Sequence, residues 1–191
     1  DEQLGGIYAN RSTFEISLEV WDPEAGLSNL SVEVSGVSRA DLWVSGAPSW
    51  WNLTVNLTLP FPATYLIDIY ARDAAGNQLH TQRYVVYDTT APTVAILEPV
   101  PPGPLNYSDF VLRVAIDPDV VFLVFNGDAG RALNGTALPN WSVALALSEG
   151  LHNFTVDVRD RAGNWGRVSF AFEIDLTPPS PVVTGISDGL E

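Results

Sequence analysis

The stretch DAAGN at Asp73–Asn77, continuing to DTTAP at Asp88–Pro92, decides the fold of this chain. It returns as DRAGN at Asp160–Asn164, continuing to DLTPP at Asp175–Pro179. Each residue of the second copy lies 87 positions after its partner, with no gap between them. A repeat of this length predicts two similar domains in tandem. Each copy is typical of a strand hairpin with a Gly-containing turn, followed by a linker that contains Pro.

The composition limits the classes of protein to which the chain can belong. Its 191 residues suit two domains of roughly 90 residues, a size that buries its own core. Hydrophobic residues make up 46% of the chain, well above the range of disordered segments. Cysteine is absent, which excludes disulfides and thiolate zinc sites. We expect no membrane span and no signal segment within these residues, because no run of about 18 apolar residues occurs.

The charge argues against nucleic acid as a partner. The formal net charge is −14, and all nine basic residues are Arg. A surface of this sign repels phosphates, so DNA or RNA binding is not expected. The acidity indicates either a soluble exposed surface or carboxylate clusters that bind cations.

Strict alternation of apolar and polar residues predicts strands on both halves of the chain. The second half repeats the first, with shifts of 96 and 88 positions for the two clearest strands. We also expect a short strand at Leu42–Val44 and a hairpin from Tyr65–Ala71 and Gln82–Tyr87. No helical period appears. The inward-facing residues of the clearest strands are Phe14, Ile16, Leu18 and Val20, repeated as Phe110, Leu112, Val114 and Ile116, and Leu53, Val55, Leu57 and Leu59, repeated as Trp141, Val143, Leu145 and Leu147.

These motifs carry a family resemblance. Asp-x-Ala-Gly-Asn between two strands, a closing Asp-x-Thr-(Ala/Pro)-Pro, an Asp-Pro turn and the phrase Ser148–Thr155 resemble the tandem Ig-like repeats of bacterial and archaeal surface proteins. The resemblance implies an all-β fold of two tandem Ig-like antiparallel sandwiches, each of about seven strands. Such domains serve as stalks, adhesin modules, filament parts and enzyme appendages, so the fold alone does not decide the function.

The repeat also predicts the domain boundaries. We expect a first Ig-like domain at residues 1–90 and a second at residues 91–178. Pro178–Val183 resembles the start of the second domain, where Pro92-Thr93-Val94 leads into a strand. Residues 179–191 are therefore interpreted as the start of a third domain or as a vector-derived tail. The first domain shows only a faint opening strand at Ile7 and Tyr8.

Eight of the eleven asparagines stand in an Asn-x-Ser/Thr sequon without Pro between. One interpretation is N-glycosylation of a surface protein, in an archaeon or another glycosylating organism. The other is that Asn and Thr alternate on exposed strand faces for solubility. The eight candidates are Asn10, Asn29, Asn52, Asn56, Asn106, Asn134, Asn140 and Asn153.

A calcium site is the second candidate. In an Ig-type sandwich, the turn after the second strand and the last hairpin turn lie at the same end. We therefore expect Asp117, Asp119, Asp160 and Asn164 to gather near Asp88. Calcium takes six to eight oxygen ligands, several of them from carboxylates. The alternative is that these side chains only hydrogen-bond their own turns. No other cofactor is expected.

Catalytic motifs are absent from the sequence. His80 and His152 are not equivalent in the repeat, and both are expected at exposed or edge positions. No nucleophile elbow, phosphate loop or zinc signature occurs, so we expect no enzyme. Trp50 is a candidate for stacking on a sugar, because the strand parity of its neighbour Trp51 points inward.

These observations together predict a non-catalytic stalk module of an extracellular, cell-surface or secreted protein. It would present other domains away from the cell, with neighbouring Ig-like domains of the same chain as its partners. Two alternatives stay open at this point. One is an adhesive module that binds a surface protein or glycan. The other is a filament subunit whose neighbour donates a strand to an open sheet edge.

Overall fold

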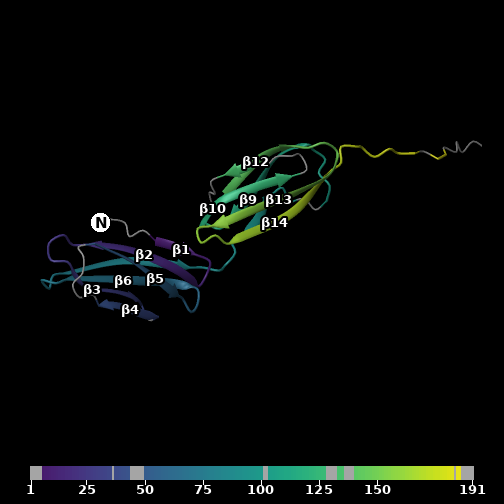
Figure 1. The fold of residues 1–191 in the computed structure, drawn as a ribbon. Helices are drawn as coiled ribbons and strands as arrows, with labels where there is room; N and C mark the ends of the chain where they lie inside the picture. Colours follow the sequence, from purple (N-terminus) through teal and green to yellow (C-terminus); the bar gives the residue numbers. More distant parts are fainter. Residues whose placement is uncertain are drawn as a thin grey trace, which may run out of the picture. The chain divides into compact units, whose positions relative to one another are not determined.

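The computed structural model describes residues 6–35, 37–43, 50–100, 103–127, 133–135, 140–182 and 184–185. Within them the secondary structure is entirely β, and no helix is long and apolar enough to cross a membrane. The chain forms two compact units. The first comprises residues 1–92 with 119–121 and 158–166, and the second comprises the rest. Figure 1 labels the strands in chain order.

The first sandwich is built from the first half of the chain. One sheet has the order β1-β7-β6-β3-β4, and the other contains β2 and β5. All these strands pair antiparallel except β1, which runs parallel to β7. The strands are β1 (Gly6–Ala9), β2 (Thr13–Trp21), β3 (Leu27–Val34), β4 (Ser38–Trp43), β5 (Trp50–Thr58), β6 (Ala63–Asp73) and β7 (Gln78–Tyr87).

The second half of the chain forms the second sandwich. Its sheets have the orders β11-β10-β13-β14 and β12-β9-β8. The isolated parallel bridge from Leu105 to Ile174 takes the place that the β1–β7 pairing has in the first sandwich. The strands are β8 (Val94–Glu98), β9 (Asp109–Ile116), β10 (Val120–Gly127), β11 (Leu133–Gly135), β12 (Asn140–Ala146), β13 (Gly150–Asp160) and β14 (Trp165–Ile174).

The alternation seen in the sequence is repeated in the burial of β6, β9 and β13, where buried residues alternate with more exposed ones, as expected for a sheet with one solvated face. In the first core Leu30, Val32 and Ile67 are almost fully buried. In the second, Leu112, Val114 and Phe125 are. The predicted all-β class, with two antiparallel sandwiches of about seven strands each, is therefore confirmed.

Two strand predictions were too short or misplaced. The hairpin strands β6 and β7 extend to Asp73 and Gln78, so the turn between them is only four residues long. The sequence hid this because most of the added residues, among them Arg72, Asp73 and Gln78, are polar. The fourth strand is β4 at Ser38–Trp43, not Leu42–Val44. Val44 itself lies outside the described residues.

The two repeated turns are built alike. Gly76 and Gly163 have φ values of 97° and 96°, the left-handed region that glycine adopts without a steric cost. In the first turn the Asp73 carboxylate accepts hydrogen bonds from the backbone N–H and the side-chain amide of Asn77. These bonds hold the pKa of the Asp73 carboxyl below its usual value, the side-chain bond from Asn77 contributing most. The turn is thus a structural device in its own right.

Candidate functional sites

Three carboxylates from distant parts of the sequence lie close together in the first of the two compact units. Asp88 follows β7, Asp119 precedes β10, and Asp160 ends β13. One oxygen from each lies within 4.8 Å of the others. Asp160 is only 2% exposed, whereas Asp119 is exposed. Carboxylate oxygens gathered this closely from three segments are a set that a cation such as calcium can bind. This is the one such carboxylate group among the residues that the structure describes.

Asn164 hydrogen-bonds two members of the carboxylate group, whereas Asp117 binds Thr93 instead. The Asn164 amide nitrogen donates to the Asp88 carbonyl at 2.8 Å and to Asp160 Oδ2 at 2.9 Å. These two hydrogen bonds link Asp88 to Asp160 through Asn164 and restrict the positions of both aspartates. Asp117 does not join the cluster. Its carboxylate accepts the backbone N–H of Thr93 at 2.6 Å and the Thr93 hydroxyl at 3.0 Å, which ties β8 to the end of β9.

Most of the sequon asparagines that are described lie at the surface. Asn10, Asn56, Asn106, Asn140 and Asn153 are exposed, and Asn29 is half-buried. Asn52 and Asn134 lie in β5 and β11, but their side chains are outside the described residues. An oligosaccharide needs a solvent-facing amide, and at least five positions provide one. Both sandwiches carry such positions.

The Trp50 prediction can be placed only by its backbone. Trp50 is the first residue of β5 and pairs with Trp21 of β2, while its side chain lies outside the described residues. Trp21 is 66% exposed. His152 lies in β13 with a ring nitrogen 2.8 Å from the Ser148 carbonyl, a local contact within the turn before the strand.

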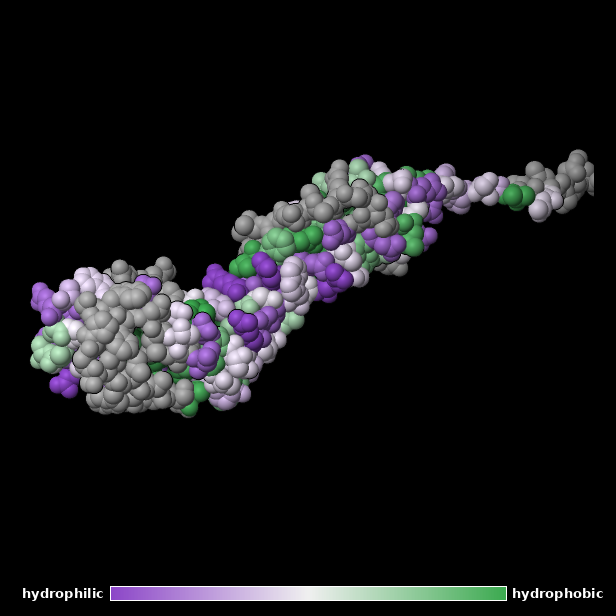
Figure 2. All heavy atoms as spheres, in the orientation of Figure 1, coloured by the Kyte–Doolittle hydropathy of each residue, from purple (hydrophilic) through white to green (hydrophobic). Residues whose placement is uncertain are grey.

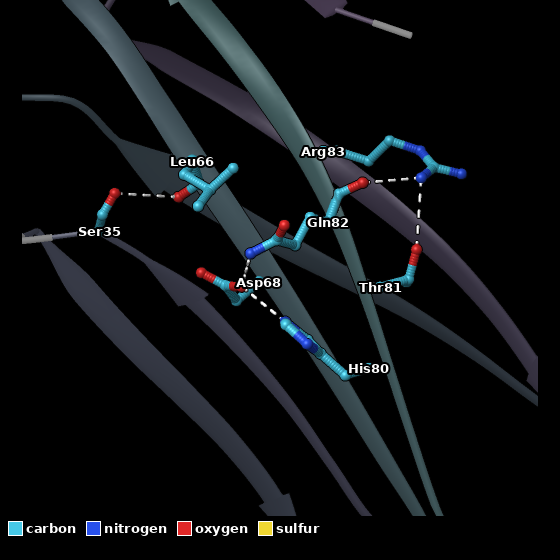
Figure 3. Close-up of polar contacts among 7 residues, drawn as sticks. All are labelled: Ser35, Leu66, Asp68, His80, Thr81, Gln82 and Arg83. Carbon is cyan, nitrogen blue, oxygen red and sulfur yellow. Dashed lines mark hydrogen bonds and ion pairs between the residues drawn. The ribbon is translucent and has the colours of Figure 1, made fainter. Parts of the chain in front are cut away.

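His80 takes part in a polar group that the sequence did not predict. On the outward face of β6 and β7, Asp68 Oδ1 accepts from the Gln82 amide at 2.7 Å and lies 2.7 Å from His80 Nε2 (Figure 3). The bonds from Gln82 and then His80 hold the pKa of the Asp68 carboxyl below its usual value. The His80 ring stacks on Tyr70 with centroids 4.4 Å apart. Antiparallel register could have indicated it, since Tyr70 and Asp68 face His80 and Gln82.

The two hydroxyl groups drawn with this group in Figure 3 are hydrogen-bonded to other partners. A His–Asp pair becomes catalytic when a nucleophile lies within hydrogen-bond reach of the imidazole. The Ser35 hydroxyl, the serine drawn in Figure 3, donates instead to the Leu66 carbonyl at 3.4 Å. The Thr81 hydroxyl accepts from Arg83. Cross-strand pairing of this kind stabilises the sheet face.

An apolar groove opens between the two sheets of the first sandwich. Its volume is about 580 Å³. It runs beside β2, with a floor of buried side chains from β6 and a rim from β1 and β7. The lining residues are Ile7, Ile16, Ser17, Leu18, Glu19, Val20, Trp21, Ile67, Ile69, Ala71, Leu79, Thr81 and Arg83. Over the face drawn in Figure 2, by contrast, hydrophobic residues are scattered in small groups among hydrophilic ones.

Comparison with solved structures finds several chains that are similar to this one at low sequence identity. The chain is similar to the fibronectin(III)-like modules of Clostridium thermocellum CbhA, with 14% identity, 88% of each chain covered and a TM-score of 0.48. It is also similar to a tetra-tandem repeat in the extending region of a large adhesion protein, with 17% identity over 86% of this chain and 50% of that one, and a TM-score of 0.38. A third similar structure is a red sea bream transglutaminase, with 11% identity over 88% of this chain and 30% of that one, and a TM-score of 0.38.

No family model and no curated protein matches the sequence. The function of this chain is therefore argued from its own residues.

Proposed function

We propose that the chain is a non-catalytic structural module of a cell-surface or secreted protein. It would act as part of a stalk that holds other domains away from the cell. The observation that carries the proposal is the repeated unit from hairpin to linker. In each copy the final strand leads directly into an Asp-x-Thr-x-Pro segment, and after the first copy that segment leads into the next sandwich. Short linkers that contain Pro limit the freedom between modules.

The outward asparagines support an extracellular location. Exposed sequons occur on strands or turns of both sandwiches. Glycans at these positions would shield the exposed strands from proteolysis and from pairing with other chains. The source that best fits these features is an archaeon or another organism with N-glycosylation.

Surface location and glycosylation can be tested together on the native source. Intact cells are treated with a protease that cannot enter them, and the released peptides are analysed by mass spectrometry. The proposal expects peptides of this chain to be released, with hexose-containing masses on Asn56, Asn140 or Asn153. If the chain resists the protease on intact cells and yields to it only after lysis, the stalk role is wrong. Release of unmodified sequon peptides would remove only the glycoprotein part.

We propose calcium as a ligand of the group formed by Asp88, Asp119 and Asp160. The support is the convergence of three carboxylates from separate segments, one of them buried. Carboxylate oxygens are the ligands that calcium prefers. The thermal midpoint of the chain would rise on adding calcium after chelation, since a ligand that binds only the folded state stabilises it.

The matched variants for calcium are Asp119→Asn and Asp117→Asn. The first removes a carboxylate of the cluster, and the second changes a neighbouring carboxylate that is bound to Thr93. Calcium should raise the midpoint of Asp117→Asn but not that of Asp119→Asn. An equal midpoint with calcium and with chelator in the unaltered chain would contradict the proposal.

A further inference from the structure

An apolar hollow opens on the surface of the second sandwich, where the chain passes from β8 to β9. Its volume is about 550 Å³. One wall is the end of β8 and the residues that follow it, and the other is the segment before β9 together with the first residues of β9. The lining includes Glu98, Val100, Asn106, Tyr107, Phe110 and Val111.

The apolar side chains of this hollow are partly open to water. Val100 is 75% exposed, and Tyr107 and Val111 are each 44% exposed. The Tyr107 ring contacts Phe110 edge-on, with centroids 6.2 Å apart, and the Phe110 ring in turn packs on the buried Phe172. These contacts hold the Tyr107 ring against the sandwich while part of it stays solvated. Covering such apolar area is favourable, so the hollow suits a group with apolar faces.

The first sandwich carries charged residues at two equivalent positions. The repeat shift of 96 pairs Tyr107 with Arg11 and Val111 with Glu15, and both charged side chains are exposed. The fold therefore does not need apolar residues at these places. Isolated apolar residues on a surface need no explanation, but here two neighbouring positions are charged in one copy and apolar in the other. This exchange indicates that a group covers the hollow of the second sandwich.

Asn106 itself lines the hollow, and it begins the sequon Asn106-Tyr107-Ser108. Its side chain is exposed, so a sugar joined to its amide nitrogen starts within the hollow. A pyranose ring suits this surface, because its C–H faces pack on aromatic and aliphatic side chains while its hydroxyls stay hydrogen-bonded. The covalent link also keeps the sugar at a high effective concentration, so that a weak contact is enough to hold it there.

We propose that the first sugar of an N-linked glycan on Asn106 occupies this hollow, covers Tyr107 and Val111 and stabilises the second sandwich. The inference rests on the glycosylation in the proposed function. In the modification, the amide nitrogen displaces the phosphate of a lipid-linked oligosaccharide at the anomeric carbon and loses one proton, and the host's transferase catalyses this step. Glu98 lies on the wall with a carboxylate oxygen 3.4 Å from Arg113 Nη1, where it accepts a hydrogen bond from a sugar hydroxyl.

The test compares the full chain from a eukaryotic host, which links N-acetylglucosamine to sequons, with the bare chain from a bacterial host. An endoglycosidase trims each glycan to its first sugar, and mass spectrometry confirms this sugar on Asn106 and on the repeat-equivalent Asn10. In the trimmed chain, Asn106→Gln should lower the thermal midpoint of the second sandwich by about 3 °C or more, and Asn10→Gln should change that of the first by under about 1 °C. In the bare chain the two substitutions should have equally small effects.

Variants of the wall separate a seated sugar from a glycan that acts elsewhere. Tyr107→Arg together with Val111→Glu gives the second sandwich the residues of the first and keeps the sequon. In that background Asn106→Gln should change the midpoint of the trimmed chain by under about 1 °C. Val121→Glu is the matched control, because Val121 is 42% exposed and does not line the hollow. There Asn106→Gln should keep its full effect. In NMR spectra, nuclear Overhauser contacts should connect the Asn106 sugar with the Tyr107 ring.

A sugar on Asn106 that stabilises its sandwich no more than the sugar on Asn10 overturns the proposal. A stabilisation that survives the double wall variant also overturns it, because the hollow would then not hold the sugar. Both results leave the glycoprotein part of the proposed function untouched, since the sugar is present in each. On protein from the native source, sugars at other sequons with a bare Asn106 would overturn this inference alone. Bare asparagines at every sequon would remove the glycoprotein part as well.

Discussion

The two sandwiches repeat the same strands but complete their smaller sheets differently. In the second, β8 covers β9, and Leu112 and Val114 are fully buried. In the first, no strand among the described residues pairs with the corresponding edge of β2, and its counterpart residues Ile16 and Leu18 line a groove. Among the described residues, one strand is the difference between the two smaller sheets. An exposed edge is a template for pairing, and proteins protect or use such edges.

The largest expected difference between the two sandwiches is the loss of stability when equivalent core side chains are deleted. Leu112→Ala should destabilise the second sandwich by about 3 kcal/mol, since a cavity forms in a closed core. Ile16→Ala should cost less, about 2 kcal/mol, because the groove beside it lets the site relax or hydrate. Urea denaturation followed by circular dichroism measures both. Equal costs would mean that the first core is as closed as the second.

Proline at equivalent positions of β9 and β2 should also lower the stability of the two sandwiches by different amounts. The Asp117 N–H donates to the Thr93 carbonyl, and the alternation that follows gives the Ala115 N–H to β8. Ala115→Pro should therefore cost about 2 kcal/mol by leaving a ladder acceptor unpaired. Glu19→Pro, its counterpart, should cost under about 1 kcal/mol because its N–H has no strand partner. Similar losses in the two denaturation curves would contradict the free edge.

The third prediction concerns the turn glycines, which both sandwiches share. Gly76 and Gly163 have nearly the same positive φ. Gly76→Ala and Gly163→Ala should each lower the free energy of unfolding by about 1 kcal/mol, because alanine is strained in that region. The two denaturation midpoints should shift alike. A loss confined to one variant would show that the two turns are not equivalent.

The smallest effect concerns pH. The Asp73 carboxyl has a lowered pKa in the folded chain, so its contribution is present above the ordinary pKa and is lost as pH falls through the folded value. The thermal midpoint should fall slightly more between pH 5 and pH 2 in the unaltered chain than in Asp73→Asn. These two pH values bracket the ordinary aspartate pKa of about 3.9. An identical fall in both proteins would remove this role of the Asn77 hydrogen bonds.

Much of the fold could be predicted from the sequence. Period-two alternation located β2, β5, β9 and β12, since each buries one face. The polar ends of β6 and β7 were missed because hydrogen bonding to a neighbouring strand, not burial, keeps them extended. The position of β1 could not be predicted either, because the pair Ile7 and Tyr8 does not specify which sheet it joins.

The candidate sites were predictable only in part. Strand order at one end of a sandwich brings Asp119 and Asp160 together with Asp88, and the sequence motif suggested that meeting. The orientation of the Asp117 side chain could not be predicted in this way. Its carboxylate accepts hydrogen bonds from the backbone N–H and the hydroxyl of Thr93 and does not join the group. The groove had no local signal. It follows from the absence of pairing on one edge of β2, which only the three-dimensional arrangement shows.

Amide hydrogen exchange at Glu19 and Ala115 tests the central claim most directly. Both are repeat-equivalent positions near the end of a strand, and among the described residues they differ in whether a neighbouring strand accepts the N–H. In solution the Glu19 amide should exchange far faster than the Ala115 amide, because the Ala115 N–H faces β8 in the described ladder. Equal protection of the two amides in the dilute protein would contradict the account.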